Sequence, residues 1–242
     1  MQNTGNLPEI KNILLPQIMT EKEDFLIVYK PPKMHSAPIK KHTDNTLFDW
    51  CCIQYPEIKN LPGRKNGEGG LLHRLDYETH GLLIVARTKE GMENLILQQK
   101  EGRIIKEYNA LVKKCKNNLP GYPEVSKENG KIIKSAFRPY GAGRRSVRPV
   151  LHGEKQYITE IINMKKEKME IISARLKILN GFRHQIRCHL SWIGLPIIND
   201  DLYGGFSSVN GILALRAVSL TFNDIKNNKK ILFSIPDLEN TF

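Results

Sequence analysis

The sequence predicts an α+β fold whose sheet is mixed but mostly antiparallel, with a few short helices beside it. Three observations support this class. Many short segments have strand-like composition, few have helical periodicity, and hairpin-like turns join neighbouring strand candidates. The 242 residues are 40% hydrophobic, which is enough to bury one substantial core or two small ones. No apolar stretch approaches the roughly 18 residues that a membrane-spanning helix needs.

The chain is predicted to consist of an N-terminal arm over residues 1–24 and one domain over 25–242. The arm contains prolines and asparagines without clear periodicity. The domain opens with a strand at 25–29, which ends at a Lys-Pro-Pro run because proline cannot donate a hydrogen bond to a neighbouring strand. A threonine then caps a short helix over 46–55.

The middle and end of the domain supply two more helices and most of the strands. An apolar run at 82–87 lacks period-two alternation, so we expect a strand covered on both faces. Helices are predicted at 88–100, beginning at a capping threonine, and at 184–193. The other strand candidates are 105–112, 157–163, 169–179, 212–222 and 230–234, with a charged hairpin turn at 165–168.

The charge of the chain indicates a polyanionic partner. There are 37 Lys and Arg against 25 Asp and Glu, a net charge of +12, and cations that neutralise phosphates release counterions. We therefore favour nucleic acid, although a compositional bias toward lysine would also give a basic chain. The N-terminus has no secretory signal pattern, so we expect a cytoplasmic protein. The four cysteines lack metal-site spacing, and we expect free thiols.

The first motif with chemical potential is the run from His73 to Asp76, which precedes the apolar strand. A carboxylate near Arg74 should stay ionised, because a cation within about 4–6 Å stabilises it. Asp76 therefore suits a nucleophile or an electrostatic anchor better than a general acid. The alternative is that Asp76 caps a turn and that Arg74 is a solvated neighbour.

A second constellation surrounds the start of the last predicted helix. Arg183, His184, Gln185 and Arg187 lie together there, and a helix N-terminus attracts anions. Arginines four residues apart share one helix face, so the pair could bind a phosphate or a carboxylate. The alternative is an exposed basic helix face.

A third constellation is an arginine-rich segment around Tyr140. Prolines and glycines interrupt it, which predicts a loop. Arginine binds phosphates bidentately and stacks on bases, so the loop suits single-stranded RNA, the alternative being a disordered surface loop. Its arginines are Arg138, Arg144, Arg145 and Arg148. The histidines lack the spacing of a metal site and lie among positive charges, so we expect no metal.

Taken in order, these residues resemble the RluA-type family of pseudouridine synthases. Its hallmark is a His-Arg-Leu-Asp turn followed by Thr, a small residue, Gly and an apolar strand, matched here over 73–83. Three further matches follow the same order, namely a Lys-Pro pair at 30–31, a tyrosine strand at 106–112, and an arginine helix with its loop at 184–204. Three departures are His80 for Ser, Arg216 for His, and an arginine displaced to position 183 by Phe182.

The resemblance implies a bent sheet with a central basic catalytic cleft and the conversion of uridine in RNA to pseudouridine. Asp76 would be the nucleophile, Arg187 would pair with it, and Tyr108 would stack on the base or transfer a proton. The reaction is an isomerisation, so no cofactor is implied. Implied RNA contacts come from His73, Arg74, Thr79, Arg138, Arg144, Arg145, Arg183, His184 and Gln185.

The resemblance leaves the RNA target open between ribosomal RNA, most readily that of the large subunit, and transfer RNA. We expect a monomer, because the sequence contains no heptad repeat or exposed apolar stripe. Two other functions remain open. One is an RNA-binding or ribosome-assembly protein that keeps the fold without turnover, and the other is a metal-dependent nuclease using Asp76 and nearby histidines.

Overall fold

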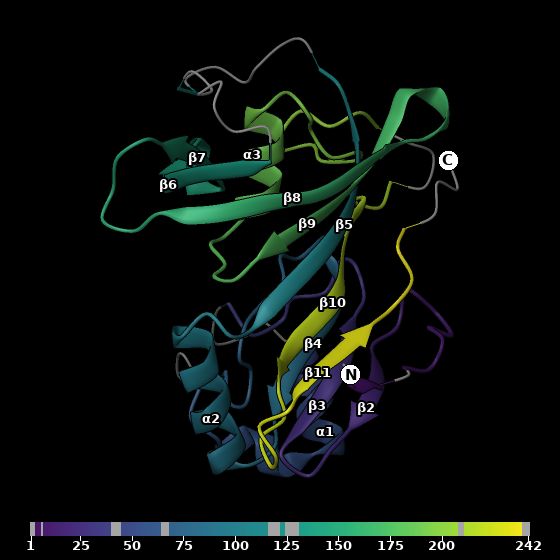
Figure 1. Cartoon of the computed structure of the whole chain (residues 1–242), viewed down its shortest axis with the longest axis vertical. Coiled ribbons are helices and arrows are strands. Elements are labelled where there is room, and N and C mark those ends of the chain that lie inside the picture. Colours follow the sequence, from purple (N-terminus) through teal and green to yellow (C-terminus); the bar gives the residue numbers. More distant parts are fainter. Residues whose placement is uncertain are drawn as a thin grey trace. The chain divides into compact units, whose positions relative to one another are not determined.

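The computed structural model describes residues 3–5, 7–39, 45–63, 68–115, 122–123, 131–207 and 211–238. The chain divides into two compact units. Unit 1 comprises Met1–Lys106 and Arg216–Pro236, and unit 2 comprises Glu107–Leu215 and Asp237–Phe242. Each unit combines short helices with strands that pair mainly in antiparallel fashion, which confirms the predicted α+β class (Figure 1).

Unit 1 contains a mixed sheet in the order β2–β3–β4–β10–β11–β1. The β1/β11 and β4/β10 pairs are parallel, and the other pairs are antiparallel. The strands are β1 (Asn3–Gly5), β2 (Gln17–Glu21), β3 (Phe25–Lys30), β4 (His80–Ala86), β10 (Leu215–Asn223) and β11 (Lys230–Ser234). Every residue of β3 and β4 is buried, so the prediction of a strand covered on both faces is confirmed.

Two strands of this sheet come from the segment predicted as an arm. β2 pairs with β3, and β1 pairs with β11. Met19 is the one buried residue of the five in β2, and so short a strand without clear alternation does not stand out in the sequence. Residues 17–21 are therefore part of the folded sheet.

The helices of unit 1 begin where their capping threonines predict. They are α1 (Leu47–Gln54), the 3-10 turn η1 (Pro56–Asn60) and α2 (Lys89–Lys100). The Thr46 side chain accepts a hydrogen bond from Asp49 N, and the Asp49 carboxylate accepts one from Thr46 N. This reciprocal arrangement is a capping box. Thr88 Oγ1 likewise accepts from Gly91 N at the start of α2. No helix among the described residues is long and apolar enough to cross a membrane.

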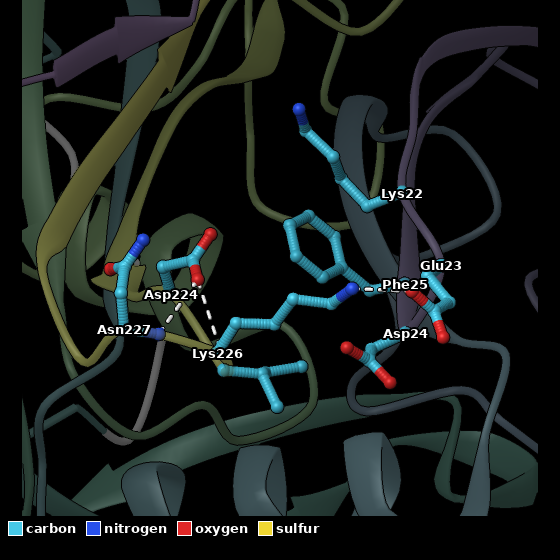
Figure 2. A pocket seen from close by; sticks show the side chains of 8 residues that line it. Lys22, Glu23, Asp24, Phe25, Asp224, Lys226 and Asn227 are labelled. Atoms are coloured by element: carbon cyan, nitrogen blue, oxygen red, sulfur yellow. Dashed lines mark hydrogen bonds and ion pairs between the residues drawn. The ribbon is translucent and has the colours of Figure 1, made fainter.

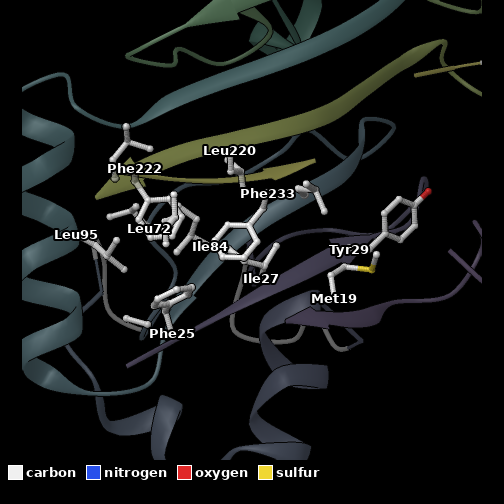
Figure 3. Close-up of a cluster of buried hydrophobic side chains, with 14 of the residues drawn as sticks. Met19, Phe25, Ile27, Tyr29, Leu72, Ile84, Leu95, Leu220, Phe222 and Phe233 are labelled. Carbon is white, nitrogen blue, oxygen red and sulfur yellow. The ribbon is translucent and has the colours of Figure 1, made fainter. Parts of the chain in front are cut away.

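The core of unit 1 consists of alternate residues of its strands, packed against α2. Phe25 contributes a ring edge-on to Phe222, with centroids 5.2 Å apart, and Phe233 lies 6.1 Å from Phe25 (Figure 3). Met92 and Leu95 of α2 belong to the same cluster. Such aromatic packing fixes the register of β3, and therefore the position at which Lys30 ends that strand.

Unit 2 contains strands in the order β5–β9–β8–β6–β7, with a single α-helix among its described residues. The elements are β5 (Ile105–Lys113), β6 (Ile132–Tyr140), β7 (Ser146–Val150), β8 (Tyr157–Lys166), β9 (Ile171–Ile178) and α3 (Gln185–Trp192), with 3-10 turns η2 (Ala142–Arg144) and η3 (Lys168–Glu170). The predicted hairpin of β8 and β9 is confirmed, although β8 continues into the residues predicted as its turn.

The arginine-rich segment around Tyr140 is a β-hairpin, so the prediction of a loop was wrong. β6 and β7 pair in antiparallel register, with Phe137 opposite Pro149 and Pro139 opposite Val147. β7 is the edge strand of its sheet, and β6 pairs with β8 only over residues 132–135. Prolines are tolerated at such positions because a missing N–H costs little where no second strand pairs.

Candidate active site

The candidate site in unit 1 is the turn that carries Asp76. Leu71 bridges to Val85 in antiparallel fashion, after which the chain turns over residues 72–79 and re-enters the sheet as β4. Asp76 is half-buried at this turn, and Arg74 and Tyr77 are exposed on either side. The sequence motif therefore presents its carboxylate directly before a buried strand.

The residue before Asp76 is held by Ser36. The Ser36 hydroxyl donates to Leu75 O at 2.9 Å and accepts from Leu75 N at 3.0 Å, and Ser36 is only 3% exposed. Both backbone polar groups of Leu75 are satisfied by one side chain, which fixes the peptide on this side of Asp76. Ser36 lies 39 residues earlier in the chain, and no sequence pattern pointed to it.

The residue after Asp76 is held by Lys30. The fully buried Lys30 Nζ donates to the carbonyl oxygens of Pro31, Met34 and Tyr77, at 2.8, 2.7 and 3.3 Å. Burial lowers the pKa of Lys30 to about 7, while the charges of Asp76 and Glu78 act in the opposite direction. Three carbonyl acceptors match the three donors of an ammonium group, so this geometry favours the protonated lysine.

Arg74 forms an ion pair with a carboxylate outside the motif. Its Nη1 forms an ion pair with Glu68 Oε1 at 2.8 Å; the Glu68 side chain is 6% exposed and that of Arg74 is 48% exposed. The buried carboxylate of Glu68 thus orients Arg74, and the charge of Asp76 acts on the buried Lys30. Glu68 and Lys30 are thus functional candidates that spacing within the motif missed.

The start of β4 is closely packed against β10. Gly81 has φ +121°, and a Cβ at this position would lie 2.2 Å from Ala217 O, so a side chain there would clash with backbone. His73, Thr79 and His80 are buried around the turn. His80 faces Arg216 in parallel register and lies edge-on to Tyr29, with ring centroids 6.3 Å apart. Two departures from the family pattern, His80 and Arg216, are therefore neighbours.

Replacing His80 by Gln should make the fold less sensitive to acid. Burial, with repulsion from Arg216 and Lys30, lowers the pKa of His80 to about 3. Between pH 6.5 and 3 the unfolded chain binds a proton at this imidazole and the folded chain does not, so stability falls as pH falls, by up to about 1.4 kcal/mol per pH unit. Between pH 7 and pH 5, the free energy of unfolding measured with urea should fall by about 2 kcal/mol more in wild type than in the variant.

The control for this experiment is His152→Gln, which removes an exposed imidazole. Burial also lowers the pKa of His189 to about 3. Wild type and the His80 variant both retain His189, so its contribution to the pH dependence of stability cancels in the comparison. An equal loss of stability in wild type and the His80 variant would show that His80 is protonated in the folded state.

Unit 2 carries the other two predicted catalytic residues. Tyr108 is buried on β5 between two residues that contact β9. Glu107 accepts hydrogen bonds from Arg175, and Asn109 donates to Ser173 Oγ at 2.9 Å. Because side chains alternate along a strand, these contacts direct Tyr108 to the opposite face.

Arg187 lies on α3 in a buried ion pair. Its Nε and Nη2 donate to the two carboxylate oxygens of Asp200 at 2.7 and 2.8 Å, and the two side chains are 2% and 0% exposed. This bidentate fork fixes the plane of the guanidinium. The ring of Tyr203 lies 5.4 Å from the same group. Asp200 borders the loop that matched the family pattern, but spacing did not identify it as a partner.

The residues before α3 support the fold. Arg183 precedes the helix, because His184 is the N-cap and has a left-handed backbone with φ 55°. The prediction that Arg183 and Arg187 share a helix face was therefore wrong. Arg183 Nη2 donates to the carbonyls of Arg144 and Ser146 at 2.8 and 3.1 Å, which anchors the β6–β7 turn.

Two more residues predicted to contact RNA make internal contacts in the structure. Gln185 is 2% exposed, and its amide nitrogen donates to Ile158 O and Thr159 Oγ1 on β8. His184 Nδ1 is hydrogen bonded to the Tyr203 hydroxyl at 3.1 Å. These contacts hold α3 in place, and the RNA contacts of Gln185 and His184 stay predictions. Arg138, Arg144 and Arg145 remain exposed on the hairpin.

A surface hollow of about 270 Å³ lies at the other end of β3. It is formed by the turns at 22–25 and 224–227, and Lys226 extends across it to an ion pair with Glu23 (Figure 2). Phe25 and Lys30 are the two ends of β3, so the hollow is separated from the Asp76 turn by the length of this strand.

Comparison with known sequences assigns the chain to a family. Residues 24–192 match the model of the RNA pseudouridylate synthase family. The chain belongs to this family, and its relatives place it in the RluA-type group.

Individual relatives extend over most of this chain. Ribosomal large subunit pseudouridine synthase D of Pseudomonas aeruginosa is 29% identical over 189 residues, which are 78% of this chain and 53% of the relative. The chain thus spans about half the length of that relative. An uncharacterized RNA pseudouridine synthase of Helicobacter pylori is 30% identical over 237 residues, which are 92% of this chain and 67% of the relative.

A solved structure shows the same fold. Human RNA Pseudouridylate Synthase Domain Containing 1 is 22% identical, with a TM-score of 0.65 over 95% of this chain and 86% of the human chain.

Proposed function

We propose that this protein is an RNA pseudouridine synthase in which Asp76 is the nucleophile. The observation that carries the proposal is the Asp76 turn, whose flanking peptides are held by Ser36 and Lys30. A carboxylate held in this way can attack a substrate without reorganising the backbone around it. No cofactor is required, because the product is an isomer of the substrate.

The reaction exchanges one bond for another. The N1–C1′ bond of uridine breaks, the base turns, C5 bonds to C1′, and the C5 proton is lost while N1 gains one. Asp76 would assist by adding to the sugar or to the uracil ring. Both routes use the carboxylate as the attacking group.

Arg187 and Tyr108 complete the proposed machinery. Arg187, oriented by Asp200, would pair with Asp76, and Tyr108 would stack on the flipped base or transfer a proton. We further propose that residues 25–242 act as one catalytic domain. Flipping a base costs a few kcal/mol, which insertion of Arg74 in the vacated space would offset.

The proposed substrate is large-subunit ribosomal RNA, with transfer RNA as the second candidate. The name of the Pseudomonas relative favours the first, and the net charge of +12 suits either. We further propose that the protein acts in the cytoplasm as a monomer, which light scattering of the purified chain would check.

Deleting the gene should remove pseudouridine from particular positions of ribosomal RNA. The measurement is transcriptome-wide pseudouridine mapping in wild-type cells, the deletion strain and the strain complemented with the wild-type gene. Restored sites identify the substrate. An unchanged map, together with retained RNA binding by the purified protein, would favour the catalytically silent RNA-binding protein. RNA cleavage that stops on adding a chelator would favour the nuclease.

A further inference from the structure

The β6–β7 hairpin carries an aromatic ring stacked on a guanidinium. The Cζ atom of Arg148 lies 3.2 Å from the ring centroid of Tyr140 and 5.6 Å from that of Tyr122. Arg148 is 7% exposed, whereas Tyr140 is 40% exposed. The arginine covers one face of the Tyr140 ring and leaves much of that side chain open to solvent.

The ring is presented by a rigid support. Tyr140 O accepts a hydrogen bond from Ser146 Oγ at 3.0 Å, and Val147 N donates to the buried Tyr203 hydroxyl at 2.9 Å. Arg183 adds two hydrogen bonds to the turn between the strands. A ring held in this way loses little conformational entropy when a planar ligand stacks on it.

The charge around the ring suits a nucleic acid strand. Arg138, Arg144 and Arg145 are exposed on the same hairpin, and arginine binds phosphate with two parallel hydrogen bonds. In register, Arg138 lies opposite Arg148, and Tyr140 is two residues beyond Arg138, so these three side chains leave the same face of the hairpin. An open ring between such cations offers stacking to a base and ion pairs to its phosphates.

We propose that the Tyr140 ring is a stacking platform for an unpaired RNA base, and that Arg148 packs on the opposite face of this ring. This inference rests on the proposed function in that RNA is the ligand, and it adds a binding site outside the residues assigned to catalysis. A base within a duplex has both faces covered, so the platform selects single-stranded or loop RNA.

The test compares Tyr140→Leu, which removes the ring, with Tyr140→Phe, which keeps it. The probe is a fluorescein-labelled single-stranded oligoribonucleotide of mixed sequence, alone or annealed to its complement, and binding is followed by anisotropy. We expect Tyr140→Leu to bind the single strand about tenfold more weakly, Tyr140→Phe to stay within about twofold, and duplex affinity to change little. Arg138→Gln is the control and should weaken both RNAs alike.

Equal affinity of Tyr140→Leu and wild type for the single strand would overturn the platform, as would an equal loss for single strand and duplex. Circular dichroism confirms that each variant is folded. Pseudouridine formation by wild type is measured separately. If wild type forms pseudouridine but Tyr140→Leu binds normally, the platform fails and the function stands; if no pseudouridine forms but the single-strand effect is present, the function fails and the platform stands.

Discussion

Changing Asp76 to Asn should reduce pseudouridine formation by at least about 10³-fold, because an amide cannot replace the carboxylate as a nucleophile. The fold around the turn should survive this change. Ser36 and Lys30 contact the backbone of Leu75 and Tyr77, and Asn has nearly the same shape as Asp. The loss should therefore appear in turnover and leave RNA affinity within a few-fold of wild type.

Tritium release measures this effect directly. RNA tritiated at carbon 5 of uracil loses its label when that carbon bonds to the ribose. Glu78→Gln is the matched control, because it makes the same carboxylate-to-amide change two residues further along the turn. Retention of more than a tenth of wild-type turnover by Asp76→Asn would exclude Asp76 as the nucleophile and favour another residue in that role.

Changing Asp200 to Asn should produce the second large effect, through Arg187. The two side chains form a bidentate ion pair at 2.7 and 2.8 Å in a region excluded from solvent. Removing one partner of a buried pair leaves an uncompensated charge, which costs about 3–5 kcal/mol. Arg187 would then lose its fixed orientation, and turnover should fall by about 10²-fold even at temperatures at which the variant remains folded.

A double variant separates stability from turnover. Arg187→Met with Asp200→Leu removes both charges, and such replacements of buried pairs are often neutral or stabilising. Urea unfolding should therefore show recovered stability, while tritium release stays as low as in Asp200→Asn. Asp201→Asn, at the exposed neighbouring carboxylate, should leave both quantities near wild type. Recovery of turnover in the double variant would mean that Arg187 acts only in folding.

The elements that the sequence predicted best are those with local signals. Thr46 and Thr88 begin their helices as expected, because a cap depends on contacts within three residues. The buried strand β4 was likewise evident from its unbroken apolar run. The β6–β7 hairpin was missed because Pro139 and Pro149 are usually strand breakers, and their tolerance depends on the absence of a second paired strand there, which sequence does not reveal.

In the candidate site too, local motifs were predictable from the sequence and long-range contacts were not. Asp76, Tyr108 and Arg187 were named from motifs, and their catalytic roles stay predictions. Their supports could not be read from spacing: Ser36 reaches Leu75 across 39 residues, and Lys30 reaches Tyr77 across 47. Arg74 was assigned to Asp76 because the two are near in sequence, whereas its ion pair is formed with Glu68. Contacts of this kind depend on tertiary structure alone.

The contacts of Lys30 and Ser36 also limit how the chain can vary in length. Lys30 holds the peptide after Asp76, and Ser36 holds the peptide before it. The segment from Lys30 to Ser36 must therefore keep a fixed length. An insertion or deletion within this segment would leave the motif at residues 73–76 unchanged, yet it would prevent the two contacts from forming together. Related chains should therefore be compared by the length of this segment as well as by the presence of the aspartate.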